Sequence, residues 1–257
     1  MQYAKAFTDA LQFMWGKGFL SPGGPEEVRQ MLAGQDLTGK IVLDVGAGLG
    51  GIDVLLAREH GAAEVVGIDV EPQLIEAARA LAREADLEDR LRFDLVEPGP
   101  LPYADASFDA VFSKDAMVHI PDKAAFYREV LRVLRPGGRF IAADWLWKEG
   151  AGTSPPVVTW LSKGPLKFAF TTPAEAETAL RDAGFADVAL IDCRAALQAS
   201  NREEIRVLEG PAMAEMAKVV GEEMARSRLA SARGRQGALD SGDLIPCHIV
   251  ARKPLAA

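Results

Sequence analysis

The chain has 257 residues, 49% of them hydrophobic, which suffices for a large core in one domain or in two small ones. Its net charge of −8 lacks the basic excess typical of nucleic-acid binding and indicates a small-molecule partner. No apolar run reaches the ~20 residues of a membrane span, and the N-terminus lacks a signal-peptide pattern. We therefore expect a cytoplasmic monomer or homodimer that binds neither membranes nor nucleic acid.

Hydrophobic periodicity predicts two N-terminal helices, at 3–15 and 26–32, followed by alternating strands and helices. Strands separated by helices form a parallel sheet, and ligands bind at the carboxyl ends of its strands. The expected strands are 41–45, 64–69, 91–95, 108–113, 138–144, 187–193 and 247–252. The expected helices between them are 51–60, 72–85, 122–134 and 173–183.

Beyond residue 145 the pattern loosens. Residues 201–232 are expected to be helical, with Asn201 and Glu204 in a capping-box arrangement and Pro211 kinking or splitting the helix. We predict an N-terminal helical cap over the active site at 1–35 and a cofactor-binding domain at 36–257. Lid segments within that domain are expected at about 146–172 and 201–246.

The first strand of the expected sheet ends in a glycine-rich turn. Such a turn presents backbone N–H groups and a helix N-terminus to one point, which suits a nucleotide-like ligand. Gly46, Gly48 and Gly51 satisfy the dinucleotide pattern G-x-G-x-x-G, so NAD or FAD must be weighed. The spacing Asp44-x-Gly46-x-Gly48-x-Gly50 resembles instead the first motif of class I methyltransferases, which use S-adenosylmethionine (SAM). There the acid lies near the cationic methionine end of SAM, whereas it would repel a pyrophosphate.

Later strand ends supply the rest of the predicted cofactor site. Asp69 closes the second strand, where an acid can accept both ribose hydroxyls of an adenosine, as it also does in NAD enzymes. After the third strand, Glu97 takes the place at which methyltransferases usually bind the adenine amino group, with Asp94 as the alternative. Val70 and Ser113, at the ends of the second and fourth strands, complete the set.

Two further blocks strengthen the resemblance. These are 108–120 (FDAVFSKDAMVHI) and 131–138 (LRVLRPGG), in which a helix ends in a tight turn into the fifth strand. Together with the glycine turn they identify the chain as a member of the class I SAM-dependent methyltransferases. The resemblance implies a doubly wound α/β sheet of seven strands, six parallel and the last antiparallel, with helices on both faces and a helical lid. No metal site is expected, because no His, Asp or Glu set has ligand spacing.

The resemblance narrows to the phosphoethanolamine N-methyltransferases in three places. These are 13–24 (FMWGKGFLSPGG), 113–119 (SKDAMVH) and 142–145 (AADW). In that family the positions matching Asp115 and His119 sit at the acceptor amine. Since they are four residues apart, on a helical turn they would face the same way. Asp115 is then expected to hold an ammonium, and His119 to take the proton that the amine loses before attack.

The chain replaces several acceptor-site residues of that family with apolar ones. Phe19 stands where the family pairs its histidine with a tyrosine, and Trp145 replaces another pocket tyrosine. Leu166 and Phe168 stand where the family offers arginine and tyrosine to phosphate. Because a phosphate would leave oxygens unpaired in such a pocket, we expect a less polar or larger acceptor. Trp15 is added to Phe19, Trp145 and Phe168 as a predicted acceptor-binding residue.

Four hypotheses for the function remain open. The first is SAM-dependent N-methylation of a small amine, which leaves S-adenosylhomocysteine and whose methylated ammonium would suit aromatic walls. The second is O- or C-methylation of an apolar or oxo-acid-like small molecule, with His119 as the base. A SAM-binding protein that has lost transfer, and an NAD-dependent oxidoreductase, are the other two.

Four arginines gather near the end of the second lid segment, at Arg226, Arg228, Arg233 and Arg235. They are interpreted as a solvated helix end, with contact to an anionic group of the acceptor as the alternative.

Overall fold

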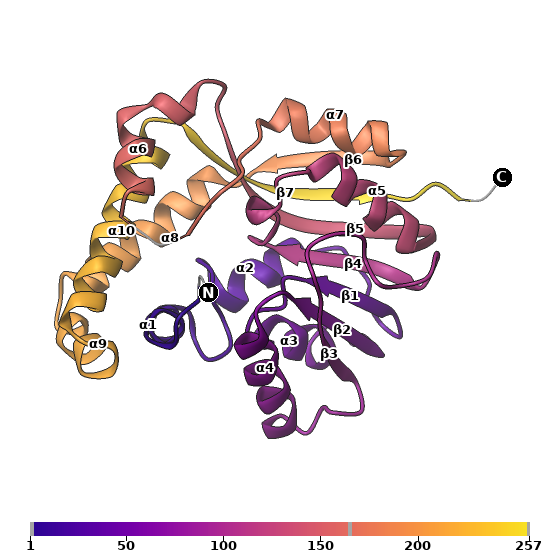
Figure 1. The fold of residues 1–257 in the computed structure, drawn as a ribbon, viewed down its shortest axis with the longest axis horizontal. Helices are drawn as coiled ribbons and strands as arrows, with labels where there is room; N and C mark the ends of the chain where they lie inside the picture. The colour runs from indigo at the N-terminus through magenta and orange to yellow at the C-terminus, as the bar shows by residue number, and fades with distance from the viewer. Residues whose placement is uncertain (1–2, 164–165, 256–257) are drawn as a thin grey trace.

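The computed structural model describes residues 3–163 and 166–255, which build one seven-stranded sheet flanked by helices (Figure 1). The strands are β1 (Ile41–Val45), β2 (Glu64–Asp69), β3 (Leu91–Leu95), β4 (Phe108–Lys114), β5 (Leu134–Trp147), β6 (Ala186–Asp192) and β7 (Leu244–Arg252). The helices on the sheet are α2 (Gly24–Met31), α3 (Gly51–Arg58), α4 (Pro72–Glu84), α5 (Lys123–Val133) and α7 (Pro173–Ala183). The other elements are α1 (Lys5–Trp15), η1 (Met117–His119), η2 (Ala151–Thr153), α6 (Pro155–Leu161), α8 (Arg194–Leu208), α9 (Ala212–Val220) and α10 (Glu222–Asp240).

The strand order is β3-β2-β1-β4-β5-β7-β6. Strand β7 runs antiparallel to both of its neighbours, and the other ladders are parallel. The predicted doubly wound α/β fold, with the last strand antiparallel, is therefore confirmed. The order reverses between β1 and β4, so the carboxyl ends of these two strands flank the place where such sheets bind ligands.

Two apolar cores lie on opposite faces of the sheet. On one face α2, α3 and α4 pack on the strands, with Leu56 and Val42 both fully buried. On the other face α5 and α7 pack on the strands, with Tyr127 and Leu43 fully buried. Successive strand residues point to opposite faces, so Val42 and Leu43 belong to different cores. The same alternation turns Asp44 toward α3, which places a carboxyl group under the glycine turn.

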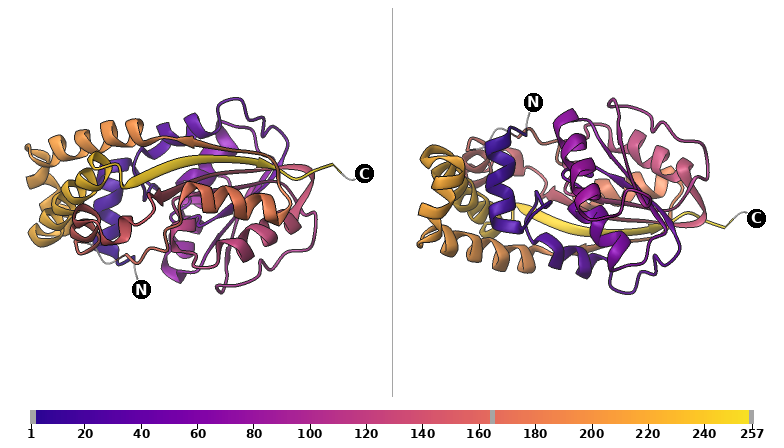
Figure 2. Two further views of the ribbon diagram at one scale, coloured as in Figure 1. Left: turned by 90° about the horizontal axis from the view of Figure 1, so that it is seen from above. Right: turned by 90° about the horizontal axis from the view of Figure 1, so that it is seen from below.

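Helices α8, α9 and α10 form a helical arm at one end of the sheet, and α1 lies against it (Figure 2). Ala10 and Met14 of α1 pack with Met216 of α9 and Ala225 of α10. Helix α6 packs along α10. The arm therefore joins the N-terminal segment to the C-terminal half of the chain.

The arm begins earlier than predicted. Helix α8 starts at Arg194, so Asn201 lies inside the helix, fully buried, and its Oδ1 accepts a hydrogen bond from Arg235 of α10. The carboxylate of Glu204 is likewise bound to α10. The predicted capping box at Asn201 is therefore wrong, because contacts between helices occupy both side chains. Pro211 does split the region, since it separates α8 from α9.

Within the ranges 3–163 and 166–255, no helix combines the length and the apolar character needed to cross a membrane. The predicted cap and lid segments and the cofactor-binding domain also include residues 1, 2, 164, 165, 256 and 257, which lie outside the described residues.

Candidate active site

The glycine turn between β1 and α3 is held tightly against neighbouring elements. The N–H groups of Gly46 and Ala47 both donate to the carbonyl of Ile68 on β2, at 2.9 and 3.0 Å. Gly46 has a φ of 83°, and a Cβ there would lie 2.2 Å from the Cβ of Ala116, so only glycine fits. Since α3 starts at Gly51, directly after the turn, its first N–H groups face the same point.

The predicted ribose acid, Asp69, is held at the end of β2. Its Oδ2 accepts from the N–H of Gly48 at 3.0 Å, and its Oδ1 from the N–H of Glu71 at 3.0 Å. Burial raises the pKa of Asp69, although these hydrogen bonds oppose the shift. The neighbouring Val70 is 50% exposed despite its apolar side chain. A carboxylate beside an exposed apolar surface suits the ribose and base of an adenosine.

The other predicted cofactor residues have different surroundings. Glu97 is exposed just beyond the end of β3, whereas the alternative, Asp94, accepts a hydrogen bond from the hydroxyl of Tyr103 at 2.8 Å. Ser113 is fully buried and donates to the carbonyl of Val45 at 2.8 Å. The hydroxyl of Ser113 therefore joins β4 to β1 near the cofactor crevice.

Two fully buried carboxyl groups lie beneath the glycine turn. Asp44 is the penultimate residue of β1 and Asp53 stands in the first turn of α3, and both are 0% exposed. None of their carboxyl oxygens accepts a hydrogen bond from the residues the structure describes. Burial, together with the proximity of the two groups, raises the pKa of Asp44 well above its usual range, and burial also raises that of Asp53. Sequence analysis identified Asp44 but missed Asp53. The available signal for Asp53 was an acid in the first turn of the helix that follows the glycine turn.

Lys114 ties the N-terminal segment to the end of β4. Its buried ammonium donates to Ser21 Oγ at 2.9 Å and to the carbonyl of Pro22 at 2.8 Å, and pairs with the carboxylates of Glu27 and Asp115, each at 2.8 Å. Burial opposes the charge, but the two carboxylates raise the pKa of Lys114 above its ordinary value. Glu27 also lies 3.3 Å from Nε2 of His248, so Lys114 is the cationic partner of Asp115 and shares Glu27 with that histidine.

Asp115 belongs to this group and also faces a cavity. Its φ of 55° lies in the left-handed region, which is uncommon for a residue with a Cβ but which aspartate adopts more readily than most residues. Burial raises the pKa of Asp115, Lys114 opposes this, and the negative charge of Glu27 adds to it. An incoming cation would relieve this unfavourable burial.

His119, at the end of η1, is oriented by two partners. Its Nδ1 lies 2.7 Å from the carbonyl of Lys167, which only accepts, so Nδ1 carries the proton of the neutral ring. Nε2 is then the acceptor, and the hydroxyl of Tyr3 lies 3.3 Å from it. Burial lowers the pKa of His119, so the ring is neutral and basic near pH 7. Sequence analysis missed Tyr3, because it sought the tyrosine partner at Phe19.

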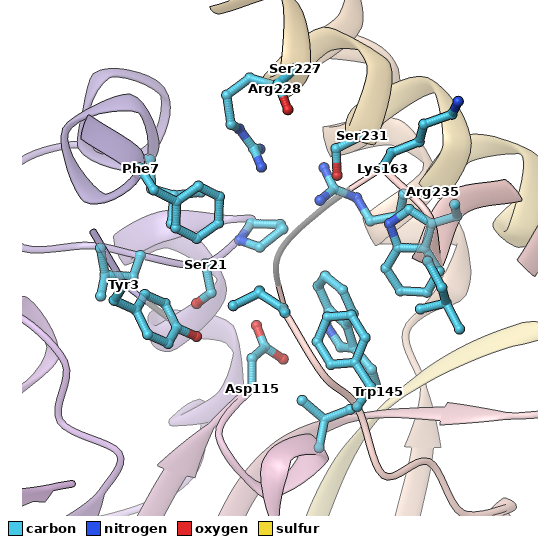
Figure 3. Close-up of a pocket in the computed structure, with 18 of the residues that line it drawn as sticks. Tyr3, Phe7, Ser21, Asp115, Trp145, Lys163, Ser227, Arg228, Ser231 and Arg235 are labelled. Atoms are coloured by element: carbon cyan, nitrogen blue, oxygen red, sulfur yellow. The ribbon is translucent and has the colours of Figure 1, made fainter. Parts of the chain in front are cut away.

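Asp115 and His119 border a cavity of about 110 Å³ between the sheet, the N-terminal segment and α10 (Figure 3). One wall of this cavity is aromatic. The ring centroids of Trp145, Trp160 and Phe168 lie between 5.5 and 6.0 Å from one another. The ring of His119 stacks on that of Phe168 at 5.3 Å, so the aromatic wall reaches the candidate base.

Helix α10 closes the opposite side of the cavity with two buried arginines (Figure 3). Arg228 and Arg235 are 4% and 3% exposed, and both pair with one carboxylate, that of Glu204 on α8. The Nε of Arg228 has no hydrogen-bond partner among the described residues. Two buried cations against one buried anion leave a net positive charge that favours binding of an anion. The interpretation as a solvated helix end holds only for Arg226 and Arg233, which are exposed.

The structure separates the predicted acceptor-binding residues. Trp145 and Phe168 line the cavity, together with Leu166. Phe19 packs against the core under α2, α3 and α4, and Trp15 is not among the described residues that line the cavity. In the described ranges, no three His, Cys, Asp or Glu side chains are grouped so that they could hold a metal ion.

Residues 37–155 match the protein family described as a methyltransferase domain. The chain is 44% identical over 126 residues to methyltransferase GfsG of Streptomyces halstedii, covering 49% of this chain and 45% of that protein. It is 32% identical over 189 residues to phosphoethanolamine N-methyltransferase 3 of Arabidopsis thaliana, covering 73% of this chain and 37% of that one. The solved structure of phosphoethanolamine N-methyltransferase 2 of Haemonchus contortus has a TM-score of 0.90 at 22% identity, over 99% of this chain and 59% of that one.

The chain therefore contains, at 37–155, a class I methyltransferase domain of the SAM-dependent kind, and it resembles the phosphoethanolamine N-methyltransferases as predicted. It spans less than half the length of these two curated relatives, 45% and 37%. Asp44, Asp69 and Asp115 fall inside the matched domain, whereas Tyr3 and the arginines of α10 fall outside it. The cavity is thus built jointly by the matched domain, which contributes Asp115 and His119, and by the segments that flank it.

Proposed function

We propose that the protein transfers a methyl group from SAM to the nitrogen of a small amine that also carries an anionic group. The observation that supports this most strongly is the opposite charge of two walls of one cavity (Figure 3). Asp115 lies on the sheet side, and Arg228 and Arg235 lie on α10. An acceptor with an amine at one end and an anion at the other would satisfy both walls.

The residues around the glycine turn fit SAM. Asp44 is buried without a partner and suits the cationic methionine end of the cofactor, whereas Asp69 and Val70 suit its ribose and adenine. Glu97, exposed beyond β3, is proposed to accept the adenine amino group. When bound, SAM supplies a methyl group that its sulfonium already activates. The protein therefore needs mainly to align the acceptor with that methyl group.

Asp115 is proposed to bind the acceptor ammonium through a charge-assisted hydrogen bond, and His119 to take its proton. Because Nδ1 donates to the carbonyl of Lys167, Nε2 is the atom that receives the proton. Tyr3 lies beside Nε2 and keeps the ring oriented. The lone pair of the free amine then forms the N–CH₃ bond as the S–CH₃ bond breaks, and that bond's electron pair stays on sulfur.

The N-terminal cap and the helical arm are proposed to exclude water from this reaction. Phe7 and Leu11 of α1 line the cavity from one side, and Met224 of α10 lines it from another. The N–H of Gly51, at the start of α3, donates to the carbonyl of Gly18 at 3.2 Å. The cap is thereby fastened to the glycine turn itself, so one cover serves both cofactor and acceptor.

The aromatic wall supports a second candidate, O- or C-methylation of an apolar acceptor that carries an anionic group. His119 would then take a proton from a hydroxyl group or an acidic carbon. Asp115, however, would face a molecule with no cation to bind. Because a buried carboxylate facing an apolar group is unfavourable, we prefer the amine.

A transfer assay with SAM labelled in its methyl group separates the two candidates. The acceptors are phosphoethanolamine, β-alanine, ethanolamine, 2-hydroxyethyl phosphate and an apolar alcohol, and mass spectrometry with NMR locates the label. We expect label on the nitrogen of phosphoethanolamine or β-alanine. This departs from the less polar acceptor expected from Leu166 and Phe168, because Arg228 and Arg235, interpreted from the sequence as part of a solvated helix end, line the cavity. Label only on oxygen or carbon would favour the second candidate. No label on any acceptor, while SAM binds, would contradict the proposed substrate class.

A further inference from the structure

The register of the sheet brings Asp53 next to Asp44. Asp44 of β1 pairs with Gly67 of β2, so the Cβ directions of both positions point to the same face of the sheet. A Cβ on Gly67 would lie 2.7 Å from Oδ1 of Asp53. Asp53 therefore lies over Gly67, beside the side chain of Asp44, and glycine at 67 leaves room for it.

No positive group compensates the two acids. Neither Asp44 nor Asp53 forms an ion pair with a described residue, and all their carboxyl oxygens lack donors. The other charged group that acts on both is Asp69 of β2, which is also an acid. The ring of Phe93 on β3 also lies over Gly67, where it and Asp53 Oδ1 would each be 2.7 Å from an added Cβ, so an apolar ring borders the same space.

From this arrangement we propose that Asp53 is a cofactor-positioning residue that shares one proton with Asp44, and that the pair releases this proton when SAM binds. Two adjacent carboxylates in an apolar site repel each other and are poorly solvated, so at and below neutral pH one proton remains between them. SAM brings a sulfonium and an α-ammonium, either of which can replace that proton as the compensating positive charge. The proposal rests on SAM being the cofactor and is independent of the acceptor.

The proton also gives Asp53 a structural task before the cofactor arrives. The contact between the two side chains raises the pKa of Asp44 and lowers that of Asp53, so the proton lies mainly on Asp44, which can donate to Asp53 and is thereby held in place under the glycine turn. Burial raises the pKa of Asp53 to about 7, so the pair gains and loses a proton near physiological pH. Loss of the shared proton leaves Asp44 to face the cationic end of SAM as an anion.

Titration calorimetry of SAM binding, in two buffers of different ionisation enthalpy, measures the released protons directly. We expect close to one proton per SAM at pH 6 and close to none at pH 8.5, with affinity rising up to tenfold per pH unit between them. Asp53→Asn removes the negative charge that raises the pKa of Asp44 and supplies an amide that can donate to it, so Asp44 should be ionised before SAM binds, release should vanish and the dissociation constant should become independent of pH. Asp89→Asn, at an exposed acid, is the matched control and should behave as wild type.

Absence of proton release by wild type would overturn the proposal, and so would release that persists in Asp53→Asn. Failure of SAM to bind would contradict both the proposed cofactor and this proposal. Failure to methylate an acceptor would leave the shared-proton proposal standing. Denaturant unfolding of the ligand-free protein provides a second readout. A raised pKa in the folded state contributes stability that is lost as pH rises through that pKa. The free energy of unfolding of Asp53→Asn should therefore increase relative to that of wild type from pH 6 to pH 8.5. A difference that is constant with pH would count against the shared proton.

Discussion

The hydroxyl of Tyr3 lies 3.3 Å from Nε2 of His119, 116 positions further along the chain. Since Nδ1 of His119 is bound to the carbonyl of Lys167, this contact reaches the one ring nitrogen that can accept a proton. His119→Ala should therefore lower kcat by about 100-fold, the usual contribution of a general base. Tyr3→Phe keeps the ring and loses one hydrogen bond, so a loss of about tenfold is expected.

Steady-state kinetics of both variants, with SAM affinity measured separately, tests this role. SAM affinity should stay within about twofold of wild type, because the side-chain hydrogen bonds of Tyr3 and His119 go to each other and to the carbonyl of Lys167 rather than to Asp69 or the glycine turn. If His119→Ala retains the full kcat, another group removes the proton.

The pH dependence of transfer follows from the burial of His119, which lowers its pKa below the usual value near 6.5. The base must be neutral, so kcat should rise with pH below about 6.5 and stay level above it. A pH profile of kcat for wild type and Tyr3→Phe measures this rise. A kcat that falls between pH 6 and pH 8 would show that the charged imidazolium is needed instead.

Variants of the arginines of α10 distinguish an effect on acceptor binding from an effect on folding stability. Arg228→Met leaves Arg235 and Glu204 as a neutral buried pair, so the free energy of unfolding should change by no more than about 1 kcal/mol. The KM for an anionic amine should nevertheless rise at least about tenfold, the effect of losing one charge-assisted contact. Glu204→Gln leaves two buried cations uncompensated and should cost about 3–5 kcal/mol.

Arg226→Met, an exposed position on the same helix, is the matched control and should change neither quantity. Denaturant unfolding and steady-state kinetics on the same preparations give both readouts. A large loss of stability in Arg228→Met with an unchanged KM would mean that the arginine is there to hold the helices together.

A second pH effect concerns stability. Burial opposes the charge on His248, but hydrogen bonds to Cys193 and to Glu27 raise its pKa to about 9. A raised pKa contributes stability that is complete below about 6.5 and is lost as pH rises through about 9. Wild type should therefore lose about 1–3 kcal/mol relative to His248→Gln between pH 6 and pH 9.5, as measured by urea unfolding at each pH. Parallel curves for the two proteins would show that His248 is neutral when folded.

Most of the fold could be predicted because its signals are local. The glycine turn and the buried strand at 64–69 are short patterns with one geometric solution, whereas the tight turn expected at 131–138 is wrong, because α5 ends at Val133 and β5 begins at Leu134. The start of α8 could not be found in this way. Asparagine is a residue type that often caps helices, but the side chain of Asn201 is bound to Arg235 of another helix. Tertiary contacts here override a local preference.

The cofactor side of the site was also more accessible to sequence reasoning than the acceptor side. Asp44 and Asp69 follow strands, where position along the chain decides position in space. Tyr3, Arg228 and Arg235 come from flanking helical segments whose packing no local pattern records. Phe19 stands where the family has a tyrosine and packs in the core, and it is Tyr3 whose hydroxyl lies beside His119, while the buried arginines of α10 line the same cavity as Leu166.

The most direct test compares phosphoethanolamine with its two halves, ethanolamine and ethyl phosphate, in wild type and in Arg228→Met. The account expects wild type to methylate phosphoethanolamine with a kcat/KM at least about 100-fold above that for ethanolamine, the effect of two charge-assisted contacts. Ethyl phosphate should inhibit competitively, and Arg228→Met should lose most of the preference. Equal use of ethanolamine and phosphoethanolamine, with no inhibition by ethyl phosphate, would contradict the account.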